Sequence, residues 1–336
     1  MFLVKKISCM IELLLAAGVV LALPPERARS DSDTVEAHVA AARAAAGTEY
    51  VELLGLCAAP DPDPPPQPGP KPSPPRPDPP PRSEWHAEPV RVFDNLYFVG
   101  QTEYSAWAVT TSAGIILIDA LWDYSVRDEV VGGLQKLGLD PRTIKYVVIS
   151  HAHIDHAGGA RYLQDRFGAH VILSAADWEL LGRDTGPWPK PRRDLTATDG
   201  QKLTLGDTTL TLYLTPGHTP GTISTLIPVK DAGQPHLAAE WGGTGFNFTV
   251  TPDKPRKYWF ETYVGSARRF RDIVAKAGAD VLISNHTHLD GSATKLPALA
   301  RRRPGDPHPY VVGNDSVKRY LTVAGECAQA GLLRLK

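Results

Sequence analysis

The sequence lacks an excess of charge of either sign. Its 36 lysine and arginine residues and 37 aspartate and glutamate residues leave a formal net charge of −1 at pH 7. A protein that binds nucleic acid through its phosphates normally carries a clustered surplus of basic residues. We interpret the arginine run at residues 301–303 as a solvated loop. The charge balance therefore predicts no nucleic-acid partner.

Long hydrophobic runs are also scarce. The apolar stretch at residues 13–21 is shorter than the roughly 20 residues of a transmembrane helix. It follows Lys5 and Lys6 and precedes the small residue Ala22, a pattern typical of an export signal. We predict a signal peptide at residues 1–22, a periplasmic or secreted mature protein, and no stable membrane insertion once the signal is removed.

Cysteine is rare, with three residues in the chain. Cys9 belongs to the predicted signal, which leaves Cys57 and Cys327. Two cysteines in an oxidising compartment can pair, and a disulfide here would tie the N-terminal extension to the final helix. Two free, buried thiols are the alternative.

Proline is unevenly distributed, and at residues 60–82 it is dense enough to exclude helix and sheet. We predict an extended polyproline spacer there, with recognition by a peptide-binding module as the alternative. Residues 23–59 form an alanine-rich extension that is expected to be helical from about residue 34 to 54. Residues 83–336 remain for one main domain without an internal repeat.

Short β-branched strands alternate with amphipathic helices in this domain. Two apolar runs at residues 90–93 and 96–99 flank Asp94 and Asn95, which predicts a hairpin. Further strands are expected at residues 114–119, 146–149, 171–173, 203–205, 208–214 and 223–229. Helices are expected at residues 124–137, 160–167, about 263–277, and from 314 or 315 to about 332.

The most informative motif follows the strand at residues 146–149, where His151, His153, Asp155 and His156 occur together. Imidazole nitrogens and carboxylate oxygens are ligands that zinc prefers. Alternate residues on a loop that leaves a strand point to opposite sides. His151 and His153 can therefore face one ion while Asp155 and His156 face another, so the motif predicts a site for two zinc ions.

Each ion needs a further ligand from a distant part of the chain. His218 is the best candidate for the first ion, because proline and glycine residues turn the chain around it at the end of a strand. His286 follows a short apolar run at residues 281–283 and is our choice for the second, with His288 as the competitor. Five other histidines lack ligand spacing: His38, His86, His170, His236 and His308.

These residues resemble the metallo-β-lactamase superfamily, from about residue 90 to the C-terminus. The resemblance is greatest to the class B β-lactamase subclass that binds one zinc through three histidines and another through Asp-His-His. It implies an α+β fold, a four-layer αββα sandwich of two sheets covered by helices. It also implies a ligand set of His151, His153 and His218 for the first zinc and Asp155, His156 and His286 for the second.

Departures from other branches of the superfamily support this subclass. Glyoxalase-like and nuclease-like members place a bridging aspartate on the strand after the third histidine, where this chain has Gly243. Two other lactamase subclasses use a cysteine ligand near that point, and none is present there. His151 stands where the mono-zinc subclass would have asparagine.

The resemblance implies hydrolysis of the β-lactam amide bond by a metal-bound hydroxide, without a covalent acyl-enzyme. Asp155 would bind zinc and orient the nucleophile. Thr244 and Asn247 would hold the substrate carboxylate, with ordinary turn residues as the alternative. Tyr104 and Trp107 would pack on the small-molecule substrate, with a place in the core as the alternative for both.

Two other functions are kept open. One is a dizinc hydrolase of another cyclic ester or a phosphodiester, such as a lactonase, against which the missing bridging aspartate argues. The other is an exported zinc-binding interaction protein whose site is vestigial and whose proline-rich tract recruits partners. The complete set of ligands argues against this second alternative.

Overall fold

The structure, a computed structural model, describes residues 33–58 and 78–335. The predicted signal peptide lies outside these residues, and so does the proline-rich tract up to residue 77. Within the described ranges, none of the helices combines the length and the apolar character needed to span a bilayer.

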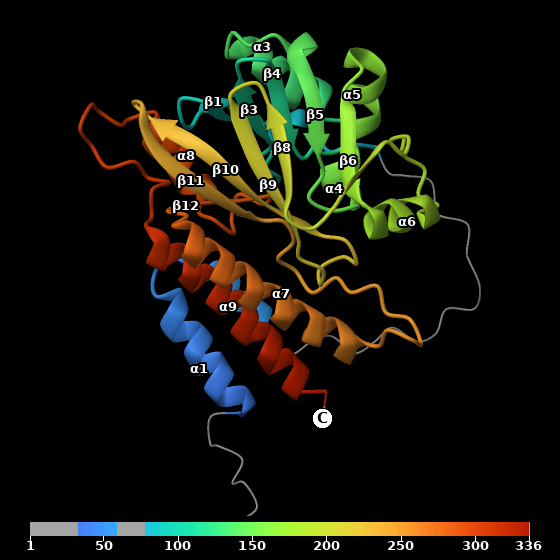
Figure 1. Ribbon diagram of the computed structural model, residues 1–336, viewed down its shortest axis with the longest axis vertical. Helices are drawn as coiled ribbons and strands as arrows, with labels where there is room; N and C mark the ends of the chain where they lie inside the picture. Colours follow the sequence, from blue (N-terminus) through green and yellow to red (C-terminus); the bar gives the residue numbers. More distant parts are fainter. Residues whose placement is uncertain (1–32, 59–77, 336) are drawn as a thin grey trace, which may run out of the picture.

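Two β-sheets form the centre of the molecule (Figure 1). The first contains seven strands in sequence order: β1 (Val90–Arg91), β2 (Leu96–Phe98), β3 (Trp107–Thr111), β4 (Gly114–Ile118), β5 (Ile144–Val148), β6 (His170–Ser174) and β7 (Leu195–Ala197). The second contains five strands in reverse order: β12 (Val281–Ser284), β11 (Gln234–Trp241), β10 (Ile223–Asp231), β9 (Thr208–Leu214) and β8 (Gln201–Leu205). Strands β4 to β7 run parallel, as do β11 and β12, and the other neighbours are antiparallel.

Helices cover the outer faces of both sheets: α3 (Gly132–Lys136), α5 (Ala160–Phe167) and α6 (Ala175–Arg183) on the first, and α1 (Val35–Ala46), α7 (Arg256–Ala277) and α9 (Asn314–Leu333) on the second. The other described α-helices are α2 (Arg82–Trp85), α4 (Ile154–Ala157) and α8 (Ser292–Leu299). Leu296 and Leu299 of α8 pack against the cluster between the sheets. Short 3-10 helices occupy Glu52–Cys57 and Pro141–Thr143, and a π-helical turn occupies Arg127–Val131.

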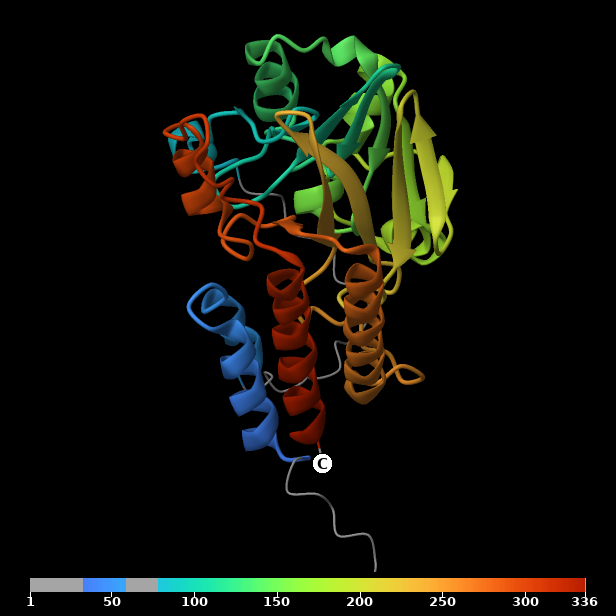
Figure 2. The ribbon, with the colours of Figure 1, turned by 60° about the vertical axis from the view of Figure 1, so that its left-hand side comes forward.

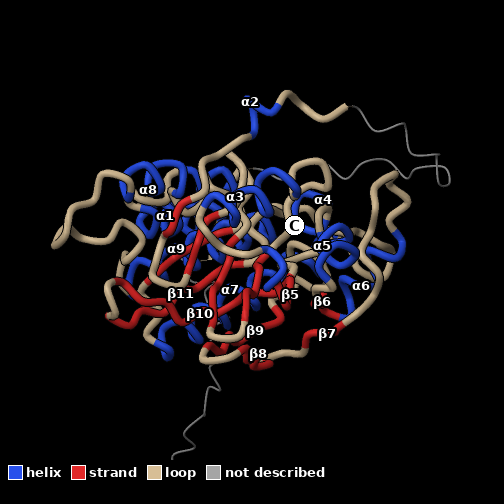
Figure 3. Tube along the Cα trace, turned by 90° about the horizontal axis from the view of Figure 1, so that it is seen from above, coloured by secondary structure: helices blue, strands red, loops and turns tan. Residues whose placement is uncertain are grey.

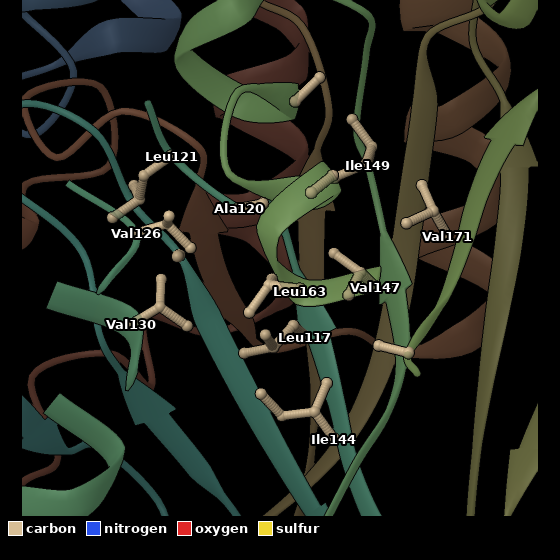
Figure 4. Packing of buried hydrophobic residues seen from close by; sticks show 14 of the residues in the cluster. Leu117, Ala120, Leu121, Val126, Val130, Ile144, Val147, Ile149, Leu163 and Val171 are labelled. Carbon is tan, nitrogen blue, oxygen red and sulfur yellow. The ribbon is translucent and has the colours of Figure 1, made fainter. Parts of the chain in front are cut away.

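Three apolar clusters lie between four layers. Leu117 of the first sheet and Leu163 of α5 belong to the outer cluster beneath α3, α5 and α6 (Figure 4). Ile116 and Ile227 belong to the cluster between the two sheets. Phe270 belongs to the cluster between the second sheet and helices α7, α9 and α1. The predicted α+β fold and its αββα layering are therefore confirmed.

Helices α7, α9 and α1 lie side by side and extend beyond the sheets (Figures 1 and 2). In α7 the buried residues Tyr263, Ala267, Phe270 and Val274 recur at helical spacing, as the sequence predicts. The helix ends at Gly278, whose φ of 71° is a left-handed conformation that glycine adopts without steric cost.

The residues before the proline-rich tract belong to the same body. Thr34 caps α1 by accepting a hydrogen bond from the backbone N–H of Ala37, and α1 packs on α9. Cys57 forms a disulfide with Cys327 of α9, so the pairing that the sequence allowed is present. The alanine-rich extension is therefore docked and covalently linked to the final helix.

Several elements were missed or misplaced by sequence reasoning. The helix expected at residues 124–137 starts at Arg127 with a π-helical turn and continues as α3 from Gly132. Strands β3, β7 and β11 and helices α6 and α8 were not expected. Strand β11 has few β-branched residues, yet a tight turn at Ala232 and Gly233, both with positive φ, pairs it with β10. Pairing with β10 and burial of its side chains thus stabilise β11 despite the low β-strand propensity of its residues.

Candidate metal centre

The predicted ligands meet at one edge of the sandwich because each follows the end of a strand. His151 and His153 lie on the loop after β5, and Asp155 and His156 lie in α4. His218 follows β9 of the second sheet, and His286 follows β12. The two sheets therefore contribute ligands to one centre.

The first group consists of His151, His153 and His218. Nε2 of His218 lies 3.0 Å from Nε2 of His151 and 3.1 Å from Nδ1 of His153. Two nitrogens that each lie 2.0–2.1 Å from a tetrahedral zinc are about 3.3 Å apart. The three atoms all lie within 4.8 Å of one another, so the group fits a metal site.

Hydrogen bonds at the far side of two rings fix which nitrogen is free. Nδ1 of His151 lies 2.8 Å from the carbonyl oxygen of Gly242, and Nδ1 of His218 lies 2.7 Å from that of Gly245. A carbonyl can only accept, so each Nδ1 carries the proton and each Nε2 presents a lone pair. Two lone pairs 3.0 Å apart repel unless a cation lies between them. The donor set therefore fits a metal ion.

Burial keeps these rings neutral. It lowers the pKa of His151 well below its ordinary value, lowers that of His153, and lowers that of His218 to about 3. Near pH 7 the three imidazoles are therefore neutral, and Nε2 of His151 and of His218 carries a lone pair. They are ready to bind a cation without first losing a proton.

Asp155, His156 and His286 form the second group. Oδ2 of Asp155 lies 3.2 Å from Nε2 of His156 and 3.8 Å from Nε2 of His286. His151, Asp155 and His156 also have ligand atoms within 4.8 Å of one another. Nε2 of His151 also faces His218, so the place of His286 as a ligand of a second ion stays a prediction. His288, the competitor, is exposed.

The electrostatics of this second group differ from those of the first. Burial disfavours the charged form of His156, but the carboxylates of Asp155 and Asp119 outweigh it and raise its pKa to about 10. Burial works against the charge of Asp155 too, yet neighbouring His156 holds its pKa below the usual range. Burial lowers the pKa of His286 to about 3. Asp155 therefore stays ionised at any ordinary pH.

Asp119 holds Ser150 and the metal ligand His156 in place through hydrogen bonds, and the sequence analysis did not identify it. One of its oxygens accepts a hydrogen bond from the backbone N–H of Ser150 at 2.7 Å. The other accepts from the Ser150 hydroxyl and from Nδ1 of His156, each at 2.8 Å. This last bond leaves Nε2 of His156 for a metal. The only signal in the sequence was an acidic residue at the end of an apolar strand.

Asp177, a second missed residue, joins two ligand loops from the first turn of α6. Its Oδ2 accepts from the backbone N–H of Ala152 at 2.9 Å and from the hydroxyl of Thr219 at 2.8 Å. Ala152 lies between His151 and His153, and Thr219 follows His218. The carboxylate is fully buried. One side chain thus holds both loops of the first group in place.

The close approach of His218 to Gly243 explains why this position has no room for a bridging aspartate. A Cβ atom built on Gly243 would lie 2.6 Å from Cβ of His218. Real Cβ atoms essentially never approach so closely, so any side chain here would push His218 away. The sequence difference therefore has a steric basis in the position of the third histidine.

A cavity of about 540 Å³ opens over the two groups. His153, Asp155 and Asn247 line it, and Asn247 is exposed, as its predicted contact with substrate requires. Thr244 is buried instead, with its hydroxyl 3.2 Å from that of Tyr320 in α9. Thr244 is 3% exposed, so a substrate would reach its hydroxyl only if the loop moved.

Tyr104 lies beside the second group, whereas Trp107 is fully buried in the core and is not available to a substrate. The ring centroid of Tyr104 is 5.2 Å from that of His286 and 6.3 Å from that of His156. The ring is about half-buried, and this burial raises the pKa of its hydroxyl to about 12. Tyr104 is therefore a neutral aromatic wall of the centre.

Comparison with known proteins agrees with this geometry. The family model described as metallo-beta-lactamase superfamily matches residues 99–232. A hydroxyacylglutathione hydrolase of Acidiphilium cryptum is 36% identical over 83 residues, which are 25% of this chain and 30% of that hydrolase. The chain thus spans less than a third of the length of that relative.

Two further similarities cover more of the chain. The N-acyl homoserine lactonase AttM of Azorhizobium caulinodans is 31% identical over 199 residues, which are 53% of this chain and 72% of the lactonase. The crystal structure of BJP-1, a subclass B3 metallo-beta-lactamase of Bradyrhizobium japonicum, superimposes with a TM-score of 0.60 and 28% identity, covering 70% of this chain and 89% of that one. The chain belongs to the metallo-beta-lactamase superfamily.

Proposed function

We propose that this protein hydrolyses the amide bond of β-lactams with two zinc ions. His151, His153 and His218 would hold the first ion, and Asp155, His156 and His286 the second. The observation that carries the proposal is the convergence of the first three imidazoles on one point, with the lone pairs of His151 and His218 facing each other. The similarity to a subclass B3 enzyme supports the choice of substrate.

When bound, zinc polarises a carbonyl oxygen and lowers the pKa of coordinated water to about 7. Asp155, which stays ionised, would accept a hydrogen bond from the attacking water through a carboxylate oxygen and so orient the water toward the lactam carbonyl. Asn247 and Arg183 line the same cavity and would hold the substrate carboxylate by hydrogen bonds.

The lining of this cavity supports direct attack by water. Among the described residues that line it, none is a serine or a cysteine, and Thr249 is the one hydroxyl residue. A covalent acyl-enzyme normally forms on such a nucleophile when a neighbouring base activates it. We therefore infer that water attacks the lactam without a covalent intermediate on the protein.

The test is hydrolysis of a chromogenic cephalosporin and a carbapenem by the zinc-loaded chain, with and without a chelator. We expect turnover of both that the chelator abolishes and that Asp155→Ala lowers by at least 100-fold. Zinc occupancy without turnover of either compound would overturn the β-lactam assignment.

Lactone hydrolysis is the second candidate, and the similarity to an N-acyl homoserine lactonase is the observation that favours it. The same centre could open a cyclic ester, because the carbonyl chemistry is alike. Gly243 stands where related hydrolases carry a bridging aspartate, which favours the lactam. Ring opening of an N-acyl homoserine lactone, followed by acid release at constant pH, separates the two candidates.

A further inference from the structure

The loop after β11 contacts two ligands of the first group through its backbone. The carbonyl of Gly242 accepts a hydrogen bond from Nδ1 of His151 at 2.8 Å, and that of Gly245 accepts one from Nδ1 of His218 at 2.7 Å. Each bond keeps the Nε2 of its ring free for a metal ion. A group that fixes this loop therefore also fixes two of the ligands.

Two buried tyrosines hold this loop at Thr244, the residue next to Gly245. The hydroxyl of Tyr263 in α7 donates to the carbonyl of Thr244 at 2.8 Å. The hydroxyl of Tyr320 in α9 lies 3.2 Å from the hydroxyl of Thr244. Both rings are fully buried, and burial raises the pKa of both phenols, so each keeps a proton to donate. Helices α7 and α9 therefore hold the loop from the side opposite the metal ligands' rings.

Tyr320 is itself supported by the N-terminal extension. Helix α9 lies between α1 and α7 (Figures 2 and 3). Tyr50, which follows α1, meets Tyr320 edge to face, with ring centroids 5.3 Å apart and an angle of 83° between the planes. This is a favourable arrangement for two aromatic rings. Tyr50 is 3% exposed, so the ring of Tyr320 has a protein neighbour rather than solvent on this side.

Polar contacts fix Tyr50 on α9. Oγ of Ser316 donates to a carboxylate oxygen of Glu49 at 2.6 Å, which uses its only proton. The hydroxyl of Tyr50, 2.6 Å from the same Oγ, is therefore the donor in their bond. Arg319 also donates to Glu49 at 2.6 Å, and the disulfide links the same extension to α9. Tyr50 is thus a fixed support for the Tyr320 ring.

We propose that Tyr320 is a positioning residue for His218, and that Tyr50 of the N-terminal extension supports it, so that the extension sets the zinc affinity of the first group. A shift of Tyr320 would release the Thr244 hydroxyl and let the carbonyl of Gly245 leave the Nδ1–H of His218. The inference rests on the metal ligands of the proposed function but not on the choice of substrate. The extension and α9 both lie outside the region matched by the family model.

The Nδ1–H proton of His218 gives the direct readout. NMR of the full zinc-loaded chain with isotope-labelled histidine would detect this proton, and its absence in His218→Gln would assign it. Competition with a chelator, followed by this signal, measures zinc affinity at the first group alone. In Tyr320→Phe, which loses only the hydroxyl, we expect the affinity to fall about tenfold. Solvent exchange of the proton should quicken by about the same factor.

Two substitutions of Tyr50 separate its ring from its hydroxyl. Tyr50→Leu removes the aromatic contact with Tyr320 and should lower the affinity about threefold to tenfold. Tyr50→Phe keeps the ring and should lower it by less than about twofold. The proposal thus requires the ring at one tyrosine and the hydroxyl at the other, a pattern that a general loss of packing does not produce.

Tyr310→Phe is the matched control. Tyr310 is also fully buried, and its hydroxyl donates to Ser292 at 2.8 Å, with no described contact to the loop after β11. This variant should leave the affinity and the exchange rate of the first group unchanged. Thr244→Val completes a double-mutant cycle with Tyr320→Phe. Because the two hydroxyls act through each other, the double variant should bind zinc about as weakly as either single variant.

Unchanged affinity and exchange in Tyr320→Phe, with unchanged circular dichroism, would overturn the proposal. So would an equal loss in Tyr310→Phe, or full additivity in the cycle. A loss in Tyr320→Phe without one in Tyr50→Leu would reject the role of the extension. If Tyr320→Phe does not fold, Thr244→Val and the two Tyr50 variants still decide the question through the same two readouts.

The outcome is separable from that of the proposed function. Turnover of a cephalosporin, with a zinc affinity that no variant changes, would uphold the reaction and reject this inference. The expected losses of affinity without turnover of any β-lactam would uphold the inference and reject the substrate assignment. Absence of zinc binding by the unaltered chain would reject the metal centre and the inference with it.

Discussion

At the level of single residues, the two groups of ligands differ in the protonation of their histidines. The rings of His151 and His218 are neutral because burial lowers their pKa values and carbonyl groups fix their protons on Nδ1. His156 has the opposite tendency, because two carboxylates surround it. A metal ion therefore meets free lone pairs in the first group and a protonated imidazole in the second.

We expect zinc to release about one proton more on binding to the second group than on binding to the first at pH 7, since ionisation of zinc-bound water can add protons at either position. The pKa of His156, raised to about 10, means that zinc must displace its proton, so affinity for the second position falls as pH falls. The protein ligands of the second position should make its affinity change about tenfold per pH unit between about pH 6 and 9, whereas the neutral ligands of the first position add no such dependence. Calorimetry in two buffers of different ionisation enthalpy measures the protons released. Equal release at both positions would contradict the assignment.

The buried carboxylate of Asp177 gives a second prediction at this scale. Asp177→Ala leaves the N–H of Ala152 and the hydroxyl of Thr219 without their acceptor, so the two loops that bear the first three histidines lose their link. We expect zinc affinity of the first position to fall by about 10–100-fold. The control is Asp165→Asn on α5, whose carboxylate pairs only with surface arginines among the described contacts. Competition with a chromogenic chelator reports both affinities, and an unchanged affinity in Asp177→Ala would exclude this positioning role.

At the scale of elements, the loop after β11 has little space for larger side chains, because Gly243 packs directly against His218. Gly243→Ala places a methyl group 2.6 Å from Cβ of His218, so we expect weaker zinc binding and loss of activity. Gly265→Ala within α7 is the matched control, because a Cβ there meets nothing within 4 Å. Alanine should stabilise that helix by up to about 1 kcal/mol. Zinc titration and thermal unfolding of both variants measure the contrast. Normal zinc affinity in Gly243→Ala would mean that His218 moves freely.

Residues of the candidate site that lie close together in the sequence could be predicted, and those that meet only through the fold mostly could not. His151, His153, Asp155 and His156 are close in the chain, so their spacing alone indicated a shared site. His218 and His286 needed the further rule that ligands follow strand ends. The layered fold followed from the resemblance and from the alternation of strands and helices, together with the apolar spacing in α7.

The supporting residues could not be found in this way. Asp119 and Asp177 act through hydrogen bonds to residues 25 to 42 positions away in the chain. Their role depends on which strands become neighbours, and local patterns do not specify that. The resemblance suggested a substrate contact for Thr244, and its burial with the hydroxyl near that of Tyr320 could not be predicted from local patterns either.

For the molecule as a whole, helix α1 of the N-terminal extension packs on α9 as the third helix of the layer that α7 and α9 form. The Cys57–Cys327 disulfide spans 270 residues, so its loss should increase the entropy of the unfolded chain substantially. We expect Cys57→Ser with Cys327→Ser to lower the free energy of unfolding by about 2–5 kcal/mol. Denaturant unfolding of this variant, and of the unaltered chain with and without reductant, checks the value. Equal stability in all three would show that packing of α1 alone holds the extension.

Such a disulfide persists in oxidising compartments, which supports our proposal that the chain is exported. Fractionation of cells that express the full sequence tests this directly. Recovery of the oxidised protein from the periplasm or the medium is expected. Accumulation of reduced protein in the cytoplasm would reject export.

The same bond also closes a covalent ring. Residues 57 and 327 are joined, and every proposed zinc ligand lies on the segment between them. A protease that cuts between residues 59 and 77 would therefore yield two polypeptides that stay linked as one molecule, with the metal centre on the longer piece. The nicked protein would migrate as a single species until it is reduced.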